Sequence, residues 1–378
     1  MKRIACLLLV VCLLSGCTGT PEETTANQTP STEATRETTT DATTESTGEA
    51  TEETTEATTE ATEPPVLFRN PLNGTPLDTP WTGRPTAVII NNIQDALPQH
   101  GISQADLIYE LETEGGITRV LGIFSDLQDV GSIGPVRSAR TFFNNIALSH
   151  DAPLIHCGGS EFALKGNYSD NGDKINNWAH INEQYNGSYF FRDYDRYRSG
   201  YAWEHTLFTT GEKLMKALSD KGYDITYEGD GYDHGLTFGD VPELGGKTAN
   251  TVTVTFRGSK TTTMTYMPET GLYAASQYGQ PWKDGTTNAQ LAFRNVLVLY
   301  TDQWFVRDSS YARSFYDLSG SGAGLFACDG QIIPITWHRD TLRGSFSYTL
   351  EDGTPLEMGV GTTYVAVVAA NKKPVSYQ

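Results

Sequence analysis

The chain has 378 residues, with 46 acidic and 27 basic side chains and a formal net charge of −19 at pH 7. This excess of carboxylates argues against proteins that hold nucleic acid by non-specific neutralisation of phosphates, although it permits a local basic pocket. The length is sufficient for two folded domains in addition to an N-terminal targeting segment.

The N-terminus has the pattern of a lipoprotein signal peptide, predicted as residues 1–16. Lys2 and Arg3 form a basic region, and the apolar core that follows, residues 4–14, is shorter than the ~20 residues of a permanent membrane helix. Small residues immediately precede Cys17, so we expect cleavage before Cys17 and attachment of a lipid to its sulfur. This predicts a protein anchored to the cell membrane on its extracytoplasmic face. An ordinary secretory signal with an incidental cysteine is the alternative.

Residues 17–65 are predicted to be a lipidated, disordered tether. After Cys17 the tract consists mainly of threonine, glutamate and alanine, and it contains no large apolar side chain. Such a composition buries too little apolar surface to offset the entropy of ordering. The tract carries a net charge of −11 and the signal peptide +2, which leaves about −10 for the folded part.

Two cysteines, Cys157 and Cys328, remain beyond the signal peptide and Cys17. Neither has the spacing of a zinc ligand, and we favour two unpaired thiols over a disulfide between domains. The sequence predicts no metal site and no cofactor.

The folded part is predicted to belong to the α+β class. Residues 66–235 are expected to form a layered α/β domain with a mixed sheet, because helical and strand patterns alternate there. The helix before the boundary has Thr209 or Thr210 as its N-cap. The predicted strands are 85–91, 105–114, 117–125 and 152–156, and the predicted helices are 137–150 and 210–221.

Residues 236–378 are expected to form a mostly antiparallel β domain. Short runs of β-branched or aromatic residues recur there, and Asp329-Gly330 and Asp352-Gly353 are hairpin signals. The predicted strands are 251–256, 261–266, 295–300, 324–327, 331–337, 344–350 and 364–368.

The first candidate site is the segment 110–119, which contains Glu110, Glu112, Glu114 and Arg119. The period of a strand puts the three glutamates on one face, and a two-residue Gly-Gly turn would place Glu112 opposite Arg119. Such carboxylates can bind a cation or raise one another's pKa values for acid/base work. A solvated hairpin face with one ion pair is the simpler alternative, and the sequence by itself favours it.

The second candidate comprises Arg137 and Arg140, expected in the first turns of a helix. Arginine is unfavourable there because of the helix dipole, so the pair suggests a clamp on a carboxylate or phosphate. Pairing of both arginines with the glutamates above is the alternative, and the two interpretations are compatible.

The third candidate comprises His156 and Ser160, where a strand enters a glycine-rich turn before a helix, a common ligand position in α/β sheets. We favour Ser160 as a single N-cap and His156 as a satisfied buried histidine. The fourth is the aromatic stretch 191–208 with Arg192, Arg196 and His205. It is either a binding surface or a packed loop whose arginines stack on its own rings.

These segments together resemble the YerB-like lipoprotein family, whose members carry two domains of unknown function. Glu112 departs from the apolar residue that the family pattern implies, so the resemblance selects Glu110 and Glu114 as shared carboxylates. Glu204-His205-Thr206 likewise replaces an implied Pro-His-Asn. The similarity is carried by residues 84–92, 101–106, 109–119, 133–140, 156–160, 295–296, 322–324, 329–330, 336–337 and 359–363.

Two functional classes follow, and the resemblance supplies no reaction to choose between them. The first is a module that binds a small anionic or glycan-like cell-envelope ligand. The second is a hydrolase or transferase of cell-wall polymers with Glu114 or Glu110 as general acid/base and His156 or His205 assisting. Nearby arginines would lower the carboxyl pKa values, which favours binding. A purely structural ion-pair network is a third interpretation. The candidate ligand-binding residues are Glu110, Glu114, Arg119, Arg137, Arg140, His156, Ser160, Arg192 and His205.

Overall fold

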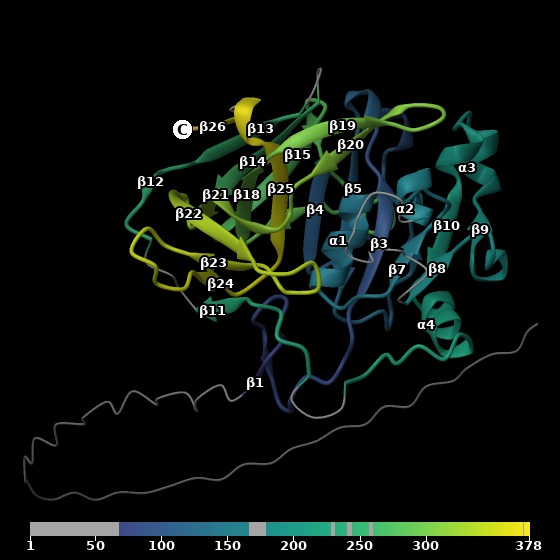
Figure 1. Ribbon diagram of the computed structural model, residues 1–378, viewed down its shortest axis with the longest axis horizontal. Coiled ribbons are helices and arrows are strands. Elements are labelled where there is room, and N and C mark those ends of the chain that lie inside the picture. The colour runs from purple at the N-terminus through teal and green to yellow at the C-terminus, as the bar shows by residue number, and fades with distance from the viewer. Residues whose placement is uncertain (1–67, 166–178, 228–230, 240–243, 257–259, 373) are drawn as a thin grey trace, which may run out of the picture. The chain divides into compact units, whose positions relative to one another are not determined.

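The structure is a computed structural model that describes residues 68–165, 179–227, 231–239, 244–256, 260–372 and 374–378. The predictions for the signal peptide, for Cys17 and for the tether lie outside the described residues. The chain divides into two compact units, and all described residues belong to the second, Glu63–Gln378 (Figure 1).

A mixed sheet of eleven strands is the centre of this unit. Its strands are β3 (Thr86–Asn91), β4 (Leu107–Glu112), β5 (Thr118–Phe124), β7 (Leu154–His156), β8 (His180–Asn182), β12 (Lys247–Thr248), β18 (Asn295–Thr301), β21 (Gly320–Cys328), β22 (Gln331–Arg339), β23 (Ser347–Thr349) and β25 (Thr363–Ala369). The order is β12-β22-β21-β18-β25-β4-β5-β3-β7-β8, and β23 pairs with β22.

Strands from the two halves of the sequence meet within this sheet. β25 pairs in parallel with β18 on one side and with β4 on the other, and Figure 1 shows β25 beside β4. The N-terminal half therefore shares its central sheet with the C-terminal half.

A second, six-stranded sheet has the order β16-β15-β14-β13-β26, with β17 paired to β15. Its strands are β13 (Thr251–Thr255), β14 (Thr261–Met267), β15 (Leu272–Gln277), β16 (Gln280–Pro281), β17 (Ala292–Phe293) and β26 (Val375–Tyr377).

Shorter elements surround the two sheets. The helices are α1 (Thr141–Ser149), α2 (Glu161–Lys165), α3 (Tyr194–Arg198) and α4 (Gly211–Asp220), and the 3₁₀ turns are η1 (Gln94–Ala96), η2 (Ile102–Gln104), η3 (Glu114–Gly116), η5 (Gly187–Tyr189), η6 (Trp203–His205) and η7 (Ala370–Lys372). The remaining strand pairs or sheets are β1 (Phe68–Arg69) with β2 (Pro76–Leu77), β6 (Ser132–Ile133) with β10 (Leu207–Thr210) and β9 (Phe191–Arg192), β11 (Thr237–Gly239) with β24 (Glu357–Gly359), and β19 (Gln303–Arg307) with β20 (Ala312–Tyr316).

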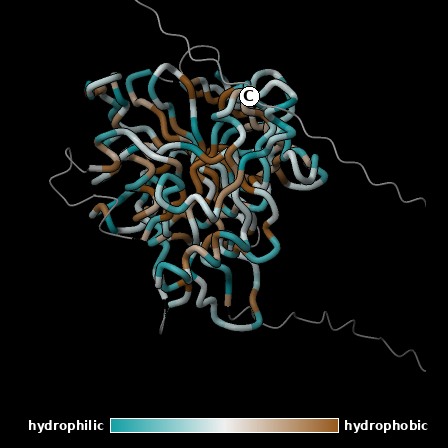
Figure 2. Tube along the Cα trace, turned by 90° about the vertical axis from the view of Figure 1, so that its right-hand side faces the viewer, coloured by the Kyte–Doolittle hydropathy of each residue, from teal (hydrophilic) through white to brown (hydrophobic). Residues whose placement is uncertain are grey.

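The core lies on both faces of the large sheet, because successive apolar side chains along each strand point to opposite faces. On β3, Val88 and Ile90 join a cluster that also contains Val252 and Met264 of the second sheet. Ile89 points the other way, into a cluster built around α1. In Figure 2 the hydrophobic segments gather in the interior of the unit.

The predicted register of the β4–β5 hairpin is wrong by one residue. Glu112 pairs with Thr118, and Arg119 therefore pairs with Leu111. The reason is the connection, which has three residues because Glu114 joins the two glycines in the η3 turn and Thr113 donates its N–H to the Ile117 carbonyl at 2.8 Å. A slip of one residue moves every side chain to the opposite face.

The predicted helix 137–150 begins later, at Thr141. The preceding residues are extended because they hydrogen bond to β3 and to the turn after β7: the Arg137 N–H donates to the Ile89 carbonyl at 2.9 Å, and the Ala139 N–H donates to the Gly158 carbonyl at 2.9 Å. Arg137 thus lies outside the helix, and the helix-dipole argument does not apply to it. Arg140 is the N-cap residue, with extended dihedral angles.

Several local predictions are confirmed. The Thr210 hydroxyl caps α4 by accepting the Lys213 N–H at 3.2 Å. Asp329-Gly330 forms the two-residue turn between β21 and β22, with φ values of 50° and 70°. Cys157 and Cys328 are free thiols. None of the helices among the described residues has both the length and the apolar character needed to cross a membrane.

Candidate functional site

The corrected register divides the predicted site between the two faces of the large sheet. Glu110 and Glu112 share a face with Val120 and Thr118, while Arg119 shares the opposite face with Leu111. The glutamates on β4 and the arginine on β5 therefore cannot form the single cluster that the sequence predicts.

Glu110 is fully buried, and its carboxylate is saturated with donors. Its Oε1 accepts hydrogen bonds from Asn92 at 2.7 Å and from Thr118 at 2.6 Å. Its Oε2 accepts the hydroxyls of Thr262 and Tyr364, both at 2.7 Å. Glu110 therefore joins β4 to strands of the C-terminal half and has no capacity left for a ligand.

Lys260 supplies the positive charge beside Glu110. Its Nζ lies 3.2 Å from the Glu110 Oε1 and donates to Thr262 at 2.9 Å and to Gln277 at 2.5 Å. Burial lowers the pKa of Lys260, and Glu110 opposes this shift. A buried pair of this kind fixes the relative position of the strands that carry it.

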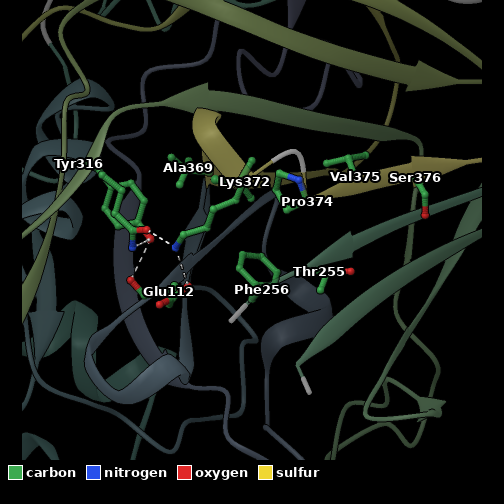
Figure 3. A pocket seen from close by; sticks show the side chains of 12 residues that line it. Glu112, Thr255, Phe256, Tyr316, Ala369, Lys372, Pro374, Val375 and Ser376 are labelled. Carbon is green, nitrogen blue, oxygen red and sulfur yellow. Dashed lines mark hydrogen bonds and ion pairs between the residues drawn. The ribbon is translucent and has the colours of Figure 1, made fainter. Parts of the chain in front are cut away.

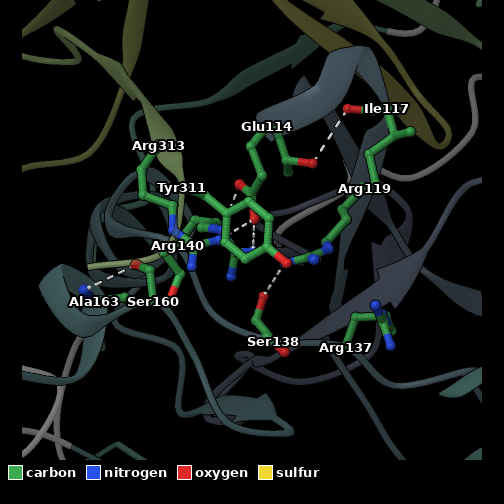
Figure 4. Close-up of polar contacts among 12 residues, drawn as sticks. Glu114, Ile117, Arg119, Arg137, Ser138, Arg140, Ser160, Ala163, Tyr311 and Arg313 are labelled. Carbon is green, nitrogen blue, oxygen red and sulfur yellow. Dashed lines mark hydrogen bonds and ion pairs between the residues drawn. The ribbon is translucent and has the colours of Figure 1, made fainter. Parts of the chain in front are cut away.

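On the other face, four arginines gather around one carboxylate. We call this group, Glu114 with Arg119, Arg137, Arg140 and Arg313, the arginine cluster. Figure 4 shows its members together with Ser138, Ser160 and Tyr311. The cluster draws on η3, on β5, on the extended segment before α1, and on β20.

Glu114 is shared by two arginines of the cluster. Arg140 donates through Nε to its Oε2 at 2.9 Å and through Nη2 to its Oε1, and Arg313 donates through Nη1 to the same Oε1. Burial acts to raise the pKa of Glu114, but the hydrogen bonds and charge of Arg140 outweigh it and lower the pKa to about 2. Glu114 is therefore ionised at neutral pH and unsuited to act as a general acid.

Arg119 is buried, and no carboxylate among the described residues forms an ion pair with it. Its Nη1 donates to the Ser138 carbonyl at 2.6 Å, and its Nε has no hydrogen-bond partner among the described residues. Burial holds the pKa of Arg119 well below its usual range; the charges of Arg140 and Arg137 add to this effect, and the charge of Glu114 opposes it. Because a guanidinium stays protonated, the shift means that its charge is poorly compensated.

Arg137 forms the more accessible edge of the cluster, with one-fifth of its side chain exposed. Its Nη1 donates to the Glu204 carbonyl at 3.3 Å, and its Nη2 lies 3.8 Å from the Glu204 carboxylate. Its Nε is buried and has no hydrogen-bond partner among the described residues. Asp308 adds the third carboxylate, at 2.6 Å from the Arg313 Nε. The cluster and its partners thus carry four positive charges and three negative ones.

His156 and Ser160 have structural partners, as the favoured interpretation predicts. The His156 Nε2 lies 3.1 Å from the His180 Nδ1, and the His156 Nδ1 lies 2.8 Å from the Gly158 carbonyl oxygen. Burial lowers the pKa of His156 to about 3. The Ser160 hydroxyl caps α2 by accepting the Ala163 N–H at 3.2 Å.

The arginines of the aromatic stretch stack on its own rings, as one of the two interpretations predicts, while the rings of Tyr194, Tyr197 and Trp203 stay exposed. Arg192 lies 4.7 Å from the centre of the Trp203 ring, and Arg196 lies 4.1 Å from that of Tyr201. His205 is buried and contacts the Asn91 amide at 3.0 Å. The ion pair of Glu204 with Arg137 links this loop to the arginine cluster.

Arg313 and Asp308 are members of the site that were not predicted from the sequence. Both belong to the β19–β20 hairpin, and Arg313 is 199 positions from Glu114 along the chain. The sequence feature that could have indicated this hairpin is the turn at Asp308. The Asp308 carboxylate accepts the N–H groups of Ser310 and Tyr311 at 2.8 and 2.7 Å and shapes the hairpin tip.

Comparisons with known proteins agree with the two halves of the sequence. The family described as "Protein of unknown function (DUF3048) N-terminal domain" matches residues 72–224, and the corresponding C-terminal domain matches residues 252–365. "Putative lipoprotein YerB" from Bacillus subtilis (strain 168) is 28% identical over 303 residues, which are 79% of this chain and 85% of that protein. A crystal structure of the YerB protein from Bacillus subtilis is similar with a TM-score of 0.67 and 27% identity, covering 82% of this chain and 99% of that one.

Proposed function

Because the chain belongs to the YerB-like family, whose two DUF3048 domains have no known function, we propose a function on the basis of the arginine cluster. The protein binds a small anionic ligand, or the anionic group of a cell-envelope glycan, at this cluster. It does so as a lipid-anchored protein on the extracytoplasmic face of the membrane, with a layered α/β domain up to residue 235 and a β-rich domain after it. The name of the relative from Bacillus subtilis supports the lipid anchor.

The observation that carries this proposal is the buried Arg119 guanidinium. It has no ion pair among the described residues, and Arg137 and Arg140 add positive charge beside it. Burial of a poorly compensated charge is costly, whereas a carboxylate or phosphate oxygen would accept the unpaired Nε–H of Arg119 in a strong, charge-assisted hydrogen bond. An anion that enters beside Arg137 would also neutralise the excess charge of the cluster.

The alternative functions account for less. A hydrolase or transferase needs a carboxyl group that can donate a proton, yet Glu114 has a pKa of about 2 and Glu110 is saturated with donors. A purely structural network explains Arg140 and Arg313, which share Glu114. It does not explain why Arg119 is buried beside other arginines.

The test measures stabilisation of the full chain, purified in detergent, by inorganic phosphate and by acetate. At ten times its Kd, a bound anion should raise the free energy of unfolding by about 1.4 kcal/mol. Arg119→Gln should abolish this gain, and Arg198→Gln, at an exposed arginine on α3, should retain it.

Two outcomes would contradict the proposal. One is that neither anion stabilises the unmodified chain. The other is that Arg119→Gln raises the stability and responds to the anions as the unmodified chain does, which would assign Arg119 to a structural network.

A further inference from the structure

A second candidate site lies beside Glu112, whose side chain is on the face of the large sheet opposite to Arg119. It is a pocket of about 390 Å³ where the ends of β4 and β25 meet β13, β26 and the β19–β20 hairpin. Figure 3 shows Glu112, Lys372 and Tyr316 at one end of this pocket and Phe256, Pro374 and Val375 nearby. The pocket therefore combines a charged end with an apolar wall.

Glu112 is the chemical feature of this pocket. Its side chain is only 5% exposed, and its Oε1 is buried without a hydrogen-bond partner among the described residues. Its Oε2 lies 3.7 Å from the Lys372 Nζ, which is longer than a hydrogen bond. A buried carboxylate oxygen without a donor is costly, so the pocket is suited to a ligand that brings a strong donor.

Lys372 restricts what that ligand can be. Its side chain is 44% exposed, and among the described residues its Nζ donates one hydrogen bond, to the Gln303 Oε1 at 2.7 Å. An ammonium group has three donors, so Lys372 can also bind an anionic oxygen. Glu112 and Lys372 together make the charged end neutral, and this disfavours ligands that carry only a positive or only a negative charge.

We infer that this pocket binds a small zwitterion, an α-amino acid with an apolar side chain. The ammonium group of the ligand donates to the Glu112 Oε1, and its carboxylate accepts from the Lys372 Nζ. Its side chain packs against the wall that Phe256 and Val375 contribute. The inference is independent of the arginine cluster, because Glu112 and Arg119 lie on opposite faces of the sheet.

Calorimetric titration of the full chain in detergent tests this inference with L-leucine as the probe. Two further probes each lack one charge: isopentylamine has no carboxylate, and 4-methylpentanoate has no ammonium group. Leucine should bind saturably, and each single-charge probe should bind at least tenfold more weakly. Absence of leucine binding, or equal binding of isopentylamine, would overturn the inference.

Variants locate the binding in this pocket. Glu112→Gln keeps the shape of the side chain and removes its charge, so leucine should bind at least tenfold more weakly. Lys372→Met should have a similar effect at a half-exposed position, which keeps the test valid if Glu112→Gln does not fold. Glu212→Gln, at an exposed position on α4, is the matched control and should bind leucine normally. Unchanged binding in Lys372→Met or in folded Glu112→Gln would contradict the inference.

Discussion

At the residue scale, Glu110 and Glu114 of the same hairpin have carboxylates with opposite surroundings. Glu110 accepts hydrogen bonds from Asn92, Thr118, Thr262 and Tyr364, whereas Glu114 accepts from guanidinium groups. The first arrangement compensates its carboxylate inside the core. The second leaves positive charge in excess at Arg119, and this excess distinguishes a candidate binding site from a structural ion pair.

The pKa of Glu114 predicts how stability depends on pH. Its pKa falls from a usual value of 4.5 to about 2 on folding, so its contribution is present above pH 4.5 and is lost as the pH falls towards 2. The contribution is roughly 3 kcal/mol. Urea unfolding of the full chain and of Glu114→Gln from pH 7 to pH 2 measures it: the difference in stability between them should shrink over this window. A difference that does not change with pH would contradict the assignment.

At the element scale, local signals predict the elements, and distant contacts decide how they are placed. The cap of α4 and the Asp329-Gly330 turn depend on adjacent residues, and both are as predicted. The start of α1 depends on hydrogen bonds to β3 and to Gly158, which are distant in sequence. A Gly-Gly pair fits both two-residue and three-residue loops, so the hairpin register was ambiguous and the predicted site wrongly placed Arg119 on the same face as Glu110 and Glu112.

In the candidate site, Arg313 is likewise placed by a distant contact that the local sequence does not predict. The sequence identifies Glu114, Arg119, Arg137 and Arg140, because these lie in unusual local patterns. Arg313 reaches Glu114 only because the β19–β20 hairpin extends to η3, and no local pattern carries that information. The pocket beside Glu112 was missed for the same reason, since its walls come from both halves of the chain.

The position of β25 predicts that the N-terminal half does not fold by itself. Within the sheet, β4 pairs with β5 on one side and with β25 on the other, and Glu110 on β4 receives hydroxyls from Thr262 and Tyr364. A fragment of residues 66–235 would expose the edge of β4 and leave a buried carboxylate partly unpaired.

Circular dichroism and urea titration measure this effect. The fragment 66–235 should unfold without a cooperative transition, and co-expression with residues 236–378 should restore one. A cooperative transition in the isolated fragment would show that the shared strand pairing is dispensable for its folding.

At the scale of the whole molecule, the proposed lipid anchor would decide which ligands the two sites can meet. A protein held outside the membrane by Cys17 encounters envelope polymers, free anions and amino acids, and both proposed ligands belong to these classes. The anchor is therefore the premise on which the biological meaning of both sites depends.

Cys17→Ala tests this premise directly. The apolar core of the signal, residues 4–14, is too short to hold the chain permanently in a bilayer, so membrane attachment should depend on the lipid at Cys17. Cell fractionation should find the unmodified chain with the membranes and Cys17→Ala in the medium, and labelled palmitate should enter only the former. Retention of Cys17→Ala in the membrane fraction would refute the lipid anchor, and a different attachment would then have to present the two sites to their ligands.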